Sequence, residues 1–139
     1  MSDRCINGYF LRVSEEGVPY RGYMKEFEDS LDVLQEYEGG YIEVVALDCG
    51  IDIIINDEGK IKELPVNRAW TDGNGRIYDV IHGNILCVRH DGEGEFISIE
   101  KEDIPIIEKA LIPLILLKGH PFDIKVLIDS AALPVYKKG

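Results

Sequence analysis

The sequence predicts an α+β fold: a mostly antiparallel sheet of short hairpin strands, with one helix before it and one after it. Residues 41–99 alternate short β-branched segments with glycine turns, as in a sheet of hairpins. A helical pattern precedes this stretch at about residues 29–38, and a second follows it at about residues 101–112. The 139 residues correspond to one domain, 1–139, which is long enough to bury a core without metals or disulfides.

The first part of the chain predicts a strand pair and then a helix. Residues 5–27 contain two β-prone segments separated by turn residues, among them a glycine and a proline. Asp29 or Ser30 can cap the helix that follows, and Leu31 and Leu34 fall on one of its faces. Two glycines at 39–40 end it, because glycine reaches the left-handed cap conformation without steric cost.

The central stretch predicts a series of strands. Residues 41–47 are apolar on both sides and predict a central strand, whereas residues 66–70, directly after Pro65, predict a short turn or a single helical turn. Turns are expected at 57–59 and 91–94. The further strands are expected, in order, at residues 51–56, 60–64, 77–81, 85–90, 95–99 and 122–128.

The second helix is predicted from its apolar face and its acidic first turn. Ile104, Ile107, Leu111 and Leu114 share one face at helical spacing. Acidic residues at 102 and 103 suit the first turn, where the helix dipole favours anions. Pro113 is expected to kink or end this helix.

The formal net charge of −11 is unevenly distributed. Residues 1–100 hold 21 acidic and 9 basic residues, a balance of −12, whereas the last 39 hold 5 acidic and 6 basic residues, a balance of +1. Such a chain cannot bind nucleic acid or an anionic membrane through a broad basic face. The acidic surface either serves solubility or occupies a basic site on a partner protein.

The sequence predicts a cytoplasmic protein. Its start lacks the apolar segment of a secretory signal, and its longest apolar run is too short to span a bilayer. Three cysteines at wide spacing fit reduced thiols better than a disulfide framework.

The motifs of common catalytic sites are missing from the sequence. The glycine pairs at 73–75 and 92–94 lack the lysine and the helix of a phosphate-binding loop. The three histidines have no metal-ligand spacing, and no nucleophile stands out. Among many carboxylates Glu43 and Asp79 are the most constrained, yet nothing pairs them for acid–base work. No catalytic residue, metal or cofactor is therefore expected.

The candidate ligand-binding residues are Asn67, Arg68, Tyr41 and Trp70. Arginine suits carboxylates and phosphates, asparagine both donates and accepts, and an aromatic ring is close by in the sequence. In the alternative interpretation Asn67 caps a helical turn, and Arg68 pairs with a carboxylate of its own sheet. The carboxylates considered for that pair are Asp48, Glu43 and Asp79.

Four segments resemble a family of small proteins of unknown function that phages, plasmids and integrative elements of Gram-positive bacteria encode. These segments are residues 39–43, 52–59, 64–69 and 94–98. The family is marked by an asparagine–arginine–alanine motif, which matches Asn67, Arg68 and Ala69. The resemblance covers about residues 30–110, and residues 119–139 form an extension beyond it. It implies a setting among anti-restriction and other counter-defence genes, but no activity.

Three functional hypotheses follow. In the first, a non-enzymatic counter-defence protein of a phage or mobile element binds a small nucleotide-type signal near Asn67 and Arg68 and forms a dimer or larger oligomer with pockets at the interface. In the second, an acidic inhibitor occupies the nucleic-acid-binding site of a host defence complex. In the third, the protein is a small hydrolase of a nucleotide signal, which would need catalytic groups that the sequence does not supply.

Overall fold

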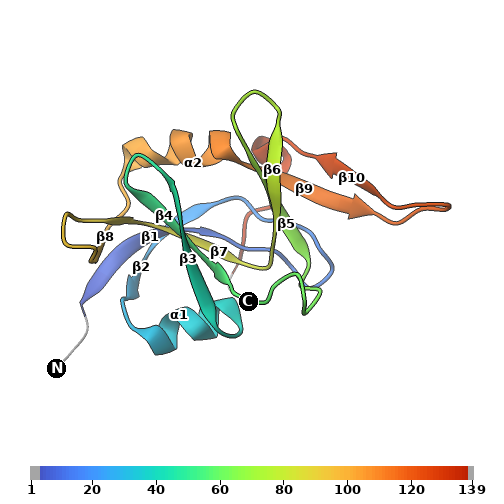
Figure 1. The fold of residues 1–139 in the computed structure, drawn as a ribbon. Helices are drawn as coiled ribbons and strands as arrows, with labels where there is room; N and C mark the ends of the chain where they lie inside the picture. The colour runs from blue at the N-terminus through green and yellow to red at the C-terminus, as the bar shows by residue number, and fades with distance from the viewer. Residues whose placement is uncertain (1–3, 138–139) are drawn as a thin grey trace.

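The computed structural model describes residues 4–137 as two antiparallel sheets and two α-helices, which confirms the α+β class (Figure 1). The first sheet has the strand order β2-β1-β7-β4-β3, with β8 paired to β7, and the second has the order β10-β9-β5-β6. The first sheet's strands are β1 (Cys5–Leu11), β2 (Tyr23–Glu28), β3 (Ile42–Asp48), β4 (Ile51–Asn56), β7 (Ile85–His90) and β8 (Phe96–Ile97). The second sheet's strands are β5 (Val66–Thr71), β6 (Ile77–His82), β9 (Leu111–Leu117) and β10 (Ile124–Leu127).

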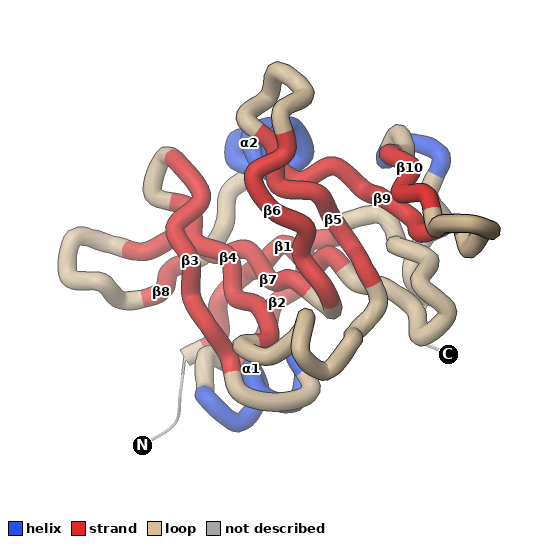
Figure 2. The backbone as a smooth tube through the Cα atoms, turned by 45° about the vertical axis from the view of Figure 1, so that its right-hand side comes forward, coloured by secondary structure: helices blue, strands red, loops and turns tan. Residues whose placement is uncertain are grey.

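The two helices lie on opposite faces of the first sheet. Helix α1 (Leu31–Glu38) begins at Ser30, whose side chain accepts a hydrogen bond from the Val33 amide, and it ends at Gly39 with φ 76°. It packs on one face through Leu34, and α2 (Ile104–Ala110) packs on the other through Ile107. The larger core lies on the α2 side, between the first sheet and strands β5, β6 and β9. Figure 2 shows β5 and β6 crossing over the first sheet.

The predicted second helix is shorter than expected. A 3₁₀ turn at Lys101–Asp103 precedes α2, and the helix ends at Ala110. Residues 111–117 instead form β9, in which Leu111 and Leu114 are buried. Strand β9 pairs with β5 on one side and with β10 on the other. These neighbours provide backbone hydrogen-bond partners to a segment whose apolar residues have helical spacing. Tertiary pairing therefore overrides the local pattern here.

Three further predictions are also wrong. Residues 60–64 form turns instead of a returning strand, with the Leu64 amide bonded to the Gly59 carbonyl. Residues 66–70 lie in β5, between β6 and β9, where a turn was expected. Strand β3, predicted as central, is an edge strand that pairs with β4 alone among the described residues, and its residue Val44 is exposed. Apolar content on both faces therefore does not identify a central strand in this chain.

The C-terminal tail returns to the start of the chain. The Arg21 amide donates to the Pro134 carbonyl at 2.9 Å, and the Arg21 side chain donates to the carbonyls of Leu133 and Ala131. The ring of Tyr136 stacks on that of Tyr23 with 5.7 Å between their centres. The tail thus covers the segment that joins β1 to β2.

None of the helices in residues 4–137 is long and apolar enough to cross a bilayer.

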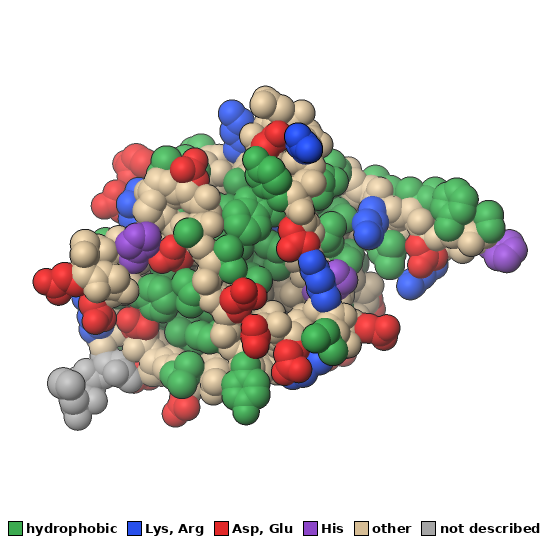
Figure 3. Space-filling model, in the orientation of Figure 1, with side chains coloured by type: hydrophobic (Ala, Val, Ile, Leu, Met, Phe, Trp, Pro, Cys, Tyr) green, Lys and Arg blue, Asp and Glu red, His purple; other side chains and the backbone are tan. Residues whose placement is uncertain are grey.

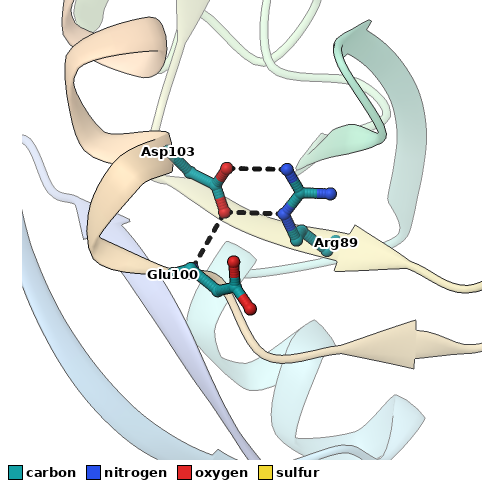
Figure 4. A network of polar contacts seen from close by, with 3 residues as sticks. All are labelled: Arg89, Glu100 and Asp103. Atoms are coloured by element: carbon teal, nitrogen blue, oxygen red, sulfur yellow. Dashed lines mark hydrogen bonds and ion pairs between the residues drawn. The ribbon is translucent and has the colours of Figure 1, made fainter.

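A bidentate ion pair fixes the start of α2 to the first sheet (Figure 4). Arg89, on β7, donates from Nε and Nη2 to the two carboxylate oxygens of Asp103 at 2.7 and 2.8 Å. The same carboxylate accepts the Glu100 amide at 2.9 Å, and Asp103 is only 2% exposed. The hydrogen bond from Arg89 holds the pKa of Asp103 below its usual value.

We expect the Asp103→Asn variant to be less stable than the wild type by roughly 1–3 kcal/mol at pH 7, since it loses a charge-assisted pair. Because the folded pKa is depressed, this contribution is present above the unfolded pKa of about 3.9 and is lost as the pH falls below it. Denaturant unfolding from pH 7 to pH 3 should therefore show the difference between the proteins shrinking. The exposed neighbour Glu102 provides the control variant Glu102→Gln. An undiminished difference at pH 3 would contradict this assignment.

The last residue of α1 provides a pH-dependent contribution of opposite sign. Glu38 is 4% exposed, and neither of its carboxyl oxygens has a hydrogen-bond partner. Burial raises its pKa well above the usual value, although the charge of Arg12 partly opposes this effect. As the pH rises above about 4.3, Glu38 ionises in the unfolded chain before it ionises in the folded one. Folding stability therefore falls with rising pH.

The Glu38→Gln variant should consequently gain stability relative to the wild type between pH 4 and pH 7, because glutamine cannot ionise. Thermal unfolding measured across this pH range tests the expectation. The exposed residue Glu36, on the same helix, provides the matched control Glu36→Gln, whose stability should follow that of the wild type. A variant curve parallel to the wild-type curve would show that Glu38 is ionised in the folded protein.

Candidate functional site

Asn67 lies inside the protein on β5 and joins three parts of the fold. Its Nδ2 donates to the Leu11 carbonyl at 2.9 Å and to the Gly83 carbonyl at 2.8 Å. Leu11 ends β1 in the first sheet, and Gly83 lies in the turn between β6 and β7. Asn67 is 0% exposed, and both hydrogens of its amide group are used within the protein.

Arg68 is also 0% exposed. Its Nη1 donates to Asn67 Oδ1 at 2.6 Å, its Nη2 donates to the Tyr20 carbonyl at 2.8 Å, and its Nε has no partner. Burial lowers the pKa of Arg68, and the negative charge of Glu108 opposes this shift. Tyr9 donates its hydroxyl to that Glu108 carboxylate, so a polar cluster lies within the apolar core.

The predicted ion pair of Arg68 is wrong. None of Asp48, Glu43 and Asp79 pairs with Arg68, and within residues 4–137 no carboxylate lies at ion-pair distance from it. The reason is that residues 66–70 form a strand between two others, which points the guanidinium inward instead of toward the carboxylates at the sheet edge. The expected tie between this segment and the rest of the fold exists, but backbone carbonyls make it.

The other two candidate residues lie elsewhere. Trp70 is half-buried and contributes to the wall of a cavity of about 420 Å³. Tyr41 is 68% exposed and directly precedes β3. The structure thus joins Asn67 to Arg68 but does not gather Tyr41 and Trp70 around them. No ligand can reach Arg68 in this conformation, because the core covers its side chain completely.

A different site lies between strands β3 and β6, which we call the β3–β6 seam. The cavity of about 420 Å³ lies at one end, and a second of about 270 Å³ lies at the other. Strand β3 contributes Leu47 and Asp48 to the first cavity and Glu43 to the second. Strand β6 contributes Tyr78 to the first and residues 79–82 to the second. Among the described residues, each strand has a strand neighbour on one side only.

Apolar side chains form the inner surface of the seam. Val45 and Leu47 of β3, Ile55 of β4 and Trp70 of β5 are partly buried against the larger core. The Trp70 ring meets that of Tyr78 edge to face, at 6.5 Å between centres. Figure 3 shows apolar side chains gathered in the middle of this face, with acidic side chains around them.

The charged residues of the seam are mostly acidic. Lys60 and Lys109 are its only two lysines, and it has no arginine, so with six carboxylates its formal balance is −4. The six acidic residues are Glu43, Asp48, Asp57, Glu58, Asp72 and Asp79. Partial burial favours the neutral form of Asp79, but the hydrogen bonds from Lys60 and from the Val80 amide, together with the charge of Lys60, outweigh it and lower the pKa of Asp79. The seam therefore stays negative at neutral pH.

Residues 4–137 contain no cluster of three or more histidine, cysteine, aspartate or glutamate side chains placed to hold a metal ion. Cys87 is fully buried, and burial raises the pKa of its thiol. Cys5 and Cys49 are exposed. The sequence does not reveal the seam, because β3 ends at residue 48 and β6 begins only at residue 77, so the fold alone brings the two strands together. Within β3, only the acidic residues Glu43 and Asp48 on either side of an apolar run point to it.

We expect the Arg68→Met variant to lose roughly 2–5 kcal/mol of stability, because it leaves the Tyr20 carbonyl, Asn67 Oδ1 and the nearby Glu108 charge uncompensated inside the protein. Denaturant unfolding monitored by Trp70 fluorescence measures this loss. Arg76, an exposed arginine in the turn before β6, provides the control Arg76→Met, which should lie within about 0.5 kcal/mol of the wild type. A similarly small effect at Arg68 would show that its contacts are dispensable.

A search of curated proteins and a search of solved structures found no match to the chain. A family model described as a domain of unknown function, DUF3846, matches residues 9–112. The match extends from β1 to the start of β9, so it includes Asn67, Arg68 and the whole β3–β6 seam but excludes β10. The chain therefore belongs to the DUF3846 family.

Proposed function

We propose that this protein is a non-enzymatic binding protein that holds an extended, basic segment of another protein in the β3–β6 seam. One observation carries the proposal: two strand edges that have no strand neighbour within residues 4–137 flank an apolar surface rimmed by six carboxylates and two lysines. This proposal is the second of the three hypotheses, the acidic inhibitor, with the binding surface now defined.

The edges of β3 and β6 supply the means of binding. An edge strand presents unpaired amide and carbonyl groups, and an extended segment can pair with them along its length. Alternate side chains of such a segment point to one face of the sheet, where the two cavities could receive them. Backbone pairing would supply affinity, and the cavities would supply specificity.

The charge of the seam decides which class of ligand is favoured. A balance of −4 attracts lysine and arginine side chains and repels phosphate groups. Binding of a nucleotide signal at Asn67 and Arg68 would, in addition, require the core to open, since both residues are 0% exposed. These two features favour a protein partner over a nucleotide-type ligand.

Proteins that bind nucleic acids carry basic segments, and an acidic protein can occupy them. A nuclease or restriction complex of a bacterial host is thus the partner class that we propose, in line with the hypothesis of counter-defence by a phage or mobile element. Electrostatic attraction would steer such a partner to the seam, and this attraction would weaken as salt is added.

The test uses a short peptide of alternating lysine and valine as the probe. Titration of the isotopically labelled protein, followed by amide shifts in NMR, should perturb β3 and β6, whereas an alternating glutamate–valine peptide should not. The affinity should fall with rising salt. The Glu43→Lys/Asp57→Lys variant, altered at two exposed seam positions, should bind at least about tenfold more weakly.

A matched control separates the seam from bulk charge. Glu26→Lys/Glu36→Lys changes two exposed residues on β2 and α1, and like the seam variant it moves the net charge from −11 to −7. Its affinity for the lysine–valine peptide should equal that of the wild type, except for the small loss of long-range electrostatic attraction that the change in net charge causes. Equal weakening in both variants, or shifts that avoid β3 and β6, would reject the proposal. Binding or turnover of any cyclic nucleotide or ADP-ribose derivative would also reject the proposal. Binding would support the nucleotide-binding hypothesis, and turnover would support the hydrolase hypothesis.

A further inference from the structure

The β9–β10 hairpin projects from the body of the protein (Figures 1 and 2). It carries exposed apolar side chains. Strand β10 lies at the end of the second sheet, and within the described residues it pairs with β9 alone. The exposed fractions are 49% for Leu117, 68% for Phe122, 53% for Ile124 and 45% for Leu127. A projecting apolar strand edge is a site at which another strand can add.

The family match ends at residue 112, so this hairpin tip and β10 lie beyond the part of the chain that the family defines. Their charge also differs from that of the seam, since residues 111–127 carry Lys118, Lys125 and Asp123, a balance of +1. The edge of β10 is therefore a feature separate from the proposed peptide-binding surface.

Residues 122–126 have a self-complementary pattern. They read Phe122-Asp123-Ile124-Lys125-Val126, with apolar residues at the ends and centre, an acid before the centre and a base after it. When two such segments pair antiparallel about Ile124, Asp123 of each copy lies opposite Lys125 of the other. Directly opposed residues of opposite charge stabilise an antiparallel pair.

The apolar residues coincide in the same register. Strand β10 begins at Ile124, so pairing about that residue has to extend the strand backward by two residues, and Phe122, Ile124 and Val126 then lie on one face. About the same centre, Phe122 of each copy faces Val126 of the other, and the two Ile124 side chains face each other. Six apolar side chains would then form one cluster, on the face opposite to that of the two ion pairs.

The two edges of the seam, β3 and β6, lack this pattern. Strand β3 carries Glu43 and Asp48 with no basic residue, and β6 carries Asp79 as its only Asp, Glu, Lys or Arg. Like charges repel when an edge of this kind meets itself. A lysine on an edge strand commonly prevents strand addition, and Lys125 would do so against a neutral edge. Asp123, two residues away, converts that barrier into a match for a second copy.

We propose that two copies of this chain pair through β10, centred on Ile124, to give a two-fold symmetric dimer. The four-stranded second sheets of the two copies then join into one continuous sheet. Each copy contributes the same surface, as in most symmetric dimers. The existing contacts of Asp123 permit this pairing: its partners are the Gly119 amide at 3.1 Å and the exposed Lys118 ammonium at 3.4 Å, both in its own hairpin.

Mass measurement by light scattering on a sizing column tests the dimer. The wild type should approach twice 15.7 kDa at concentrations up to about 200 µM, where a micromolar dissociation constant gives mostly dimer. Asp123→Lys and Lys125→Asp should each weaken dimerisation by roughly tenfold, because each places like charges opposite one another twice. The double variant Asp123→Lys/Lys125→Asp should restore the dimer, which excludes misfolding as the cause.

Cysteine cross-linking tests the register. In a Cys5→Ser/Cys49→Ser background, which removes both exposed thiols, Ile124→Cys should form a disulfide-linked dimer under mild oxidation. Leu127→Cys, at a comparably exposed position on the same strand, should not, because the two copies of residue 127 would lie about 20 Å apart. A monomer at all concentrations, a dimer unaffected by both single reversals, or preferential linkage through residue 127 would overturn the proposal.

Discussion

The buried contacts of Asn67 and Arg68 hold the two sheets together. Asn67 joins β5 to the end of β1 and to the turn before β7, and Arg68 extends that link to the Tyr20 carbonyl. A neutral amide and a cation are thereby buried in a core that is otherwise largely apolar. Burial of such groups is tolerable only when hydrogen bonds replace the water that they lose. Because these bonds reach specific carbonyls, they fix how β5 crosses the first sheet, which apolar packing alone leaves less defined.

The seam is a consequence of this crossing. Strand β5 carries β6 with it, and the orientation of β5 places the free edge of β6 opposite the free edge of β3. The Arg89–Asp103 pair fixes the start of α2, whose residues Ile106, Lys109 and Ala110 close one end of the larger cavity. Thus the contacts of Asn67 and Arg68 and the Arg89–Asp103 pair position the seam, although none of these four residues lines its cavities.

The sequence predicts well those elements whose structure is determined by residues close together in the chain. The helix at 31–38 has its cap, its apolar face and its terminal glycine in adjacent residues, so neighbouring side chains determine it. The hairpin of β7 and β8 is equally local, with its turn around Gly94. Residues 66–70 and 111–117 were predicted wrongly, because their structure depends on partners far away in the sequence. Each pairs with the other, and each has a second strand neighbour, β6 or β10, on its other side.

The candidate site shows the same limit. The pattern Asn67-Arg68-Ala69 stands out in the sequence, but whether such an arginine faces a ligand or its own protein depends on which strands surround it. Exposure of a strand edge is likewise a property of the assembled sheet, and the composition of β3 misleads about it. The charge imbalance, in contrast, is visible in the sequence, and it bears directly on the seam.

The segment around Tyr20 and Arg21 has a further consequence for how the protein folds. Its contacts reach Arg68, 48 residues away, and Leu133, 112 residues away. Contacts so distant along the chain require large loops to close before they contribute any stability, and chains rich in them fold slowly. During synthesis, β1 and β2 emerge long before either partner exists. The contacts of this segment with residues 131–136 therefore form only after those residues have left the ribosome, long after β1 and β2 have emerged.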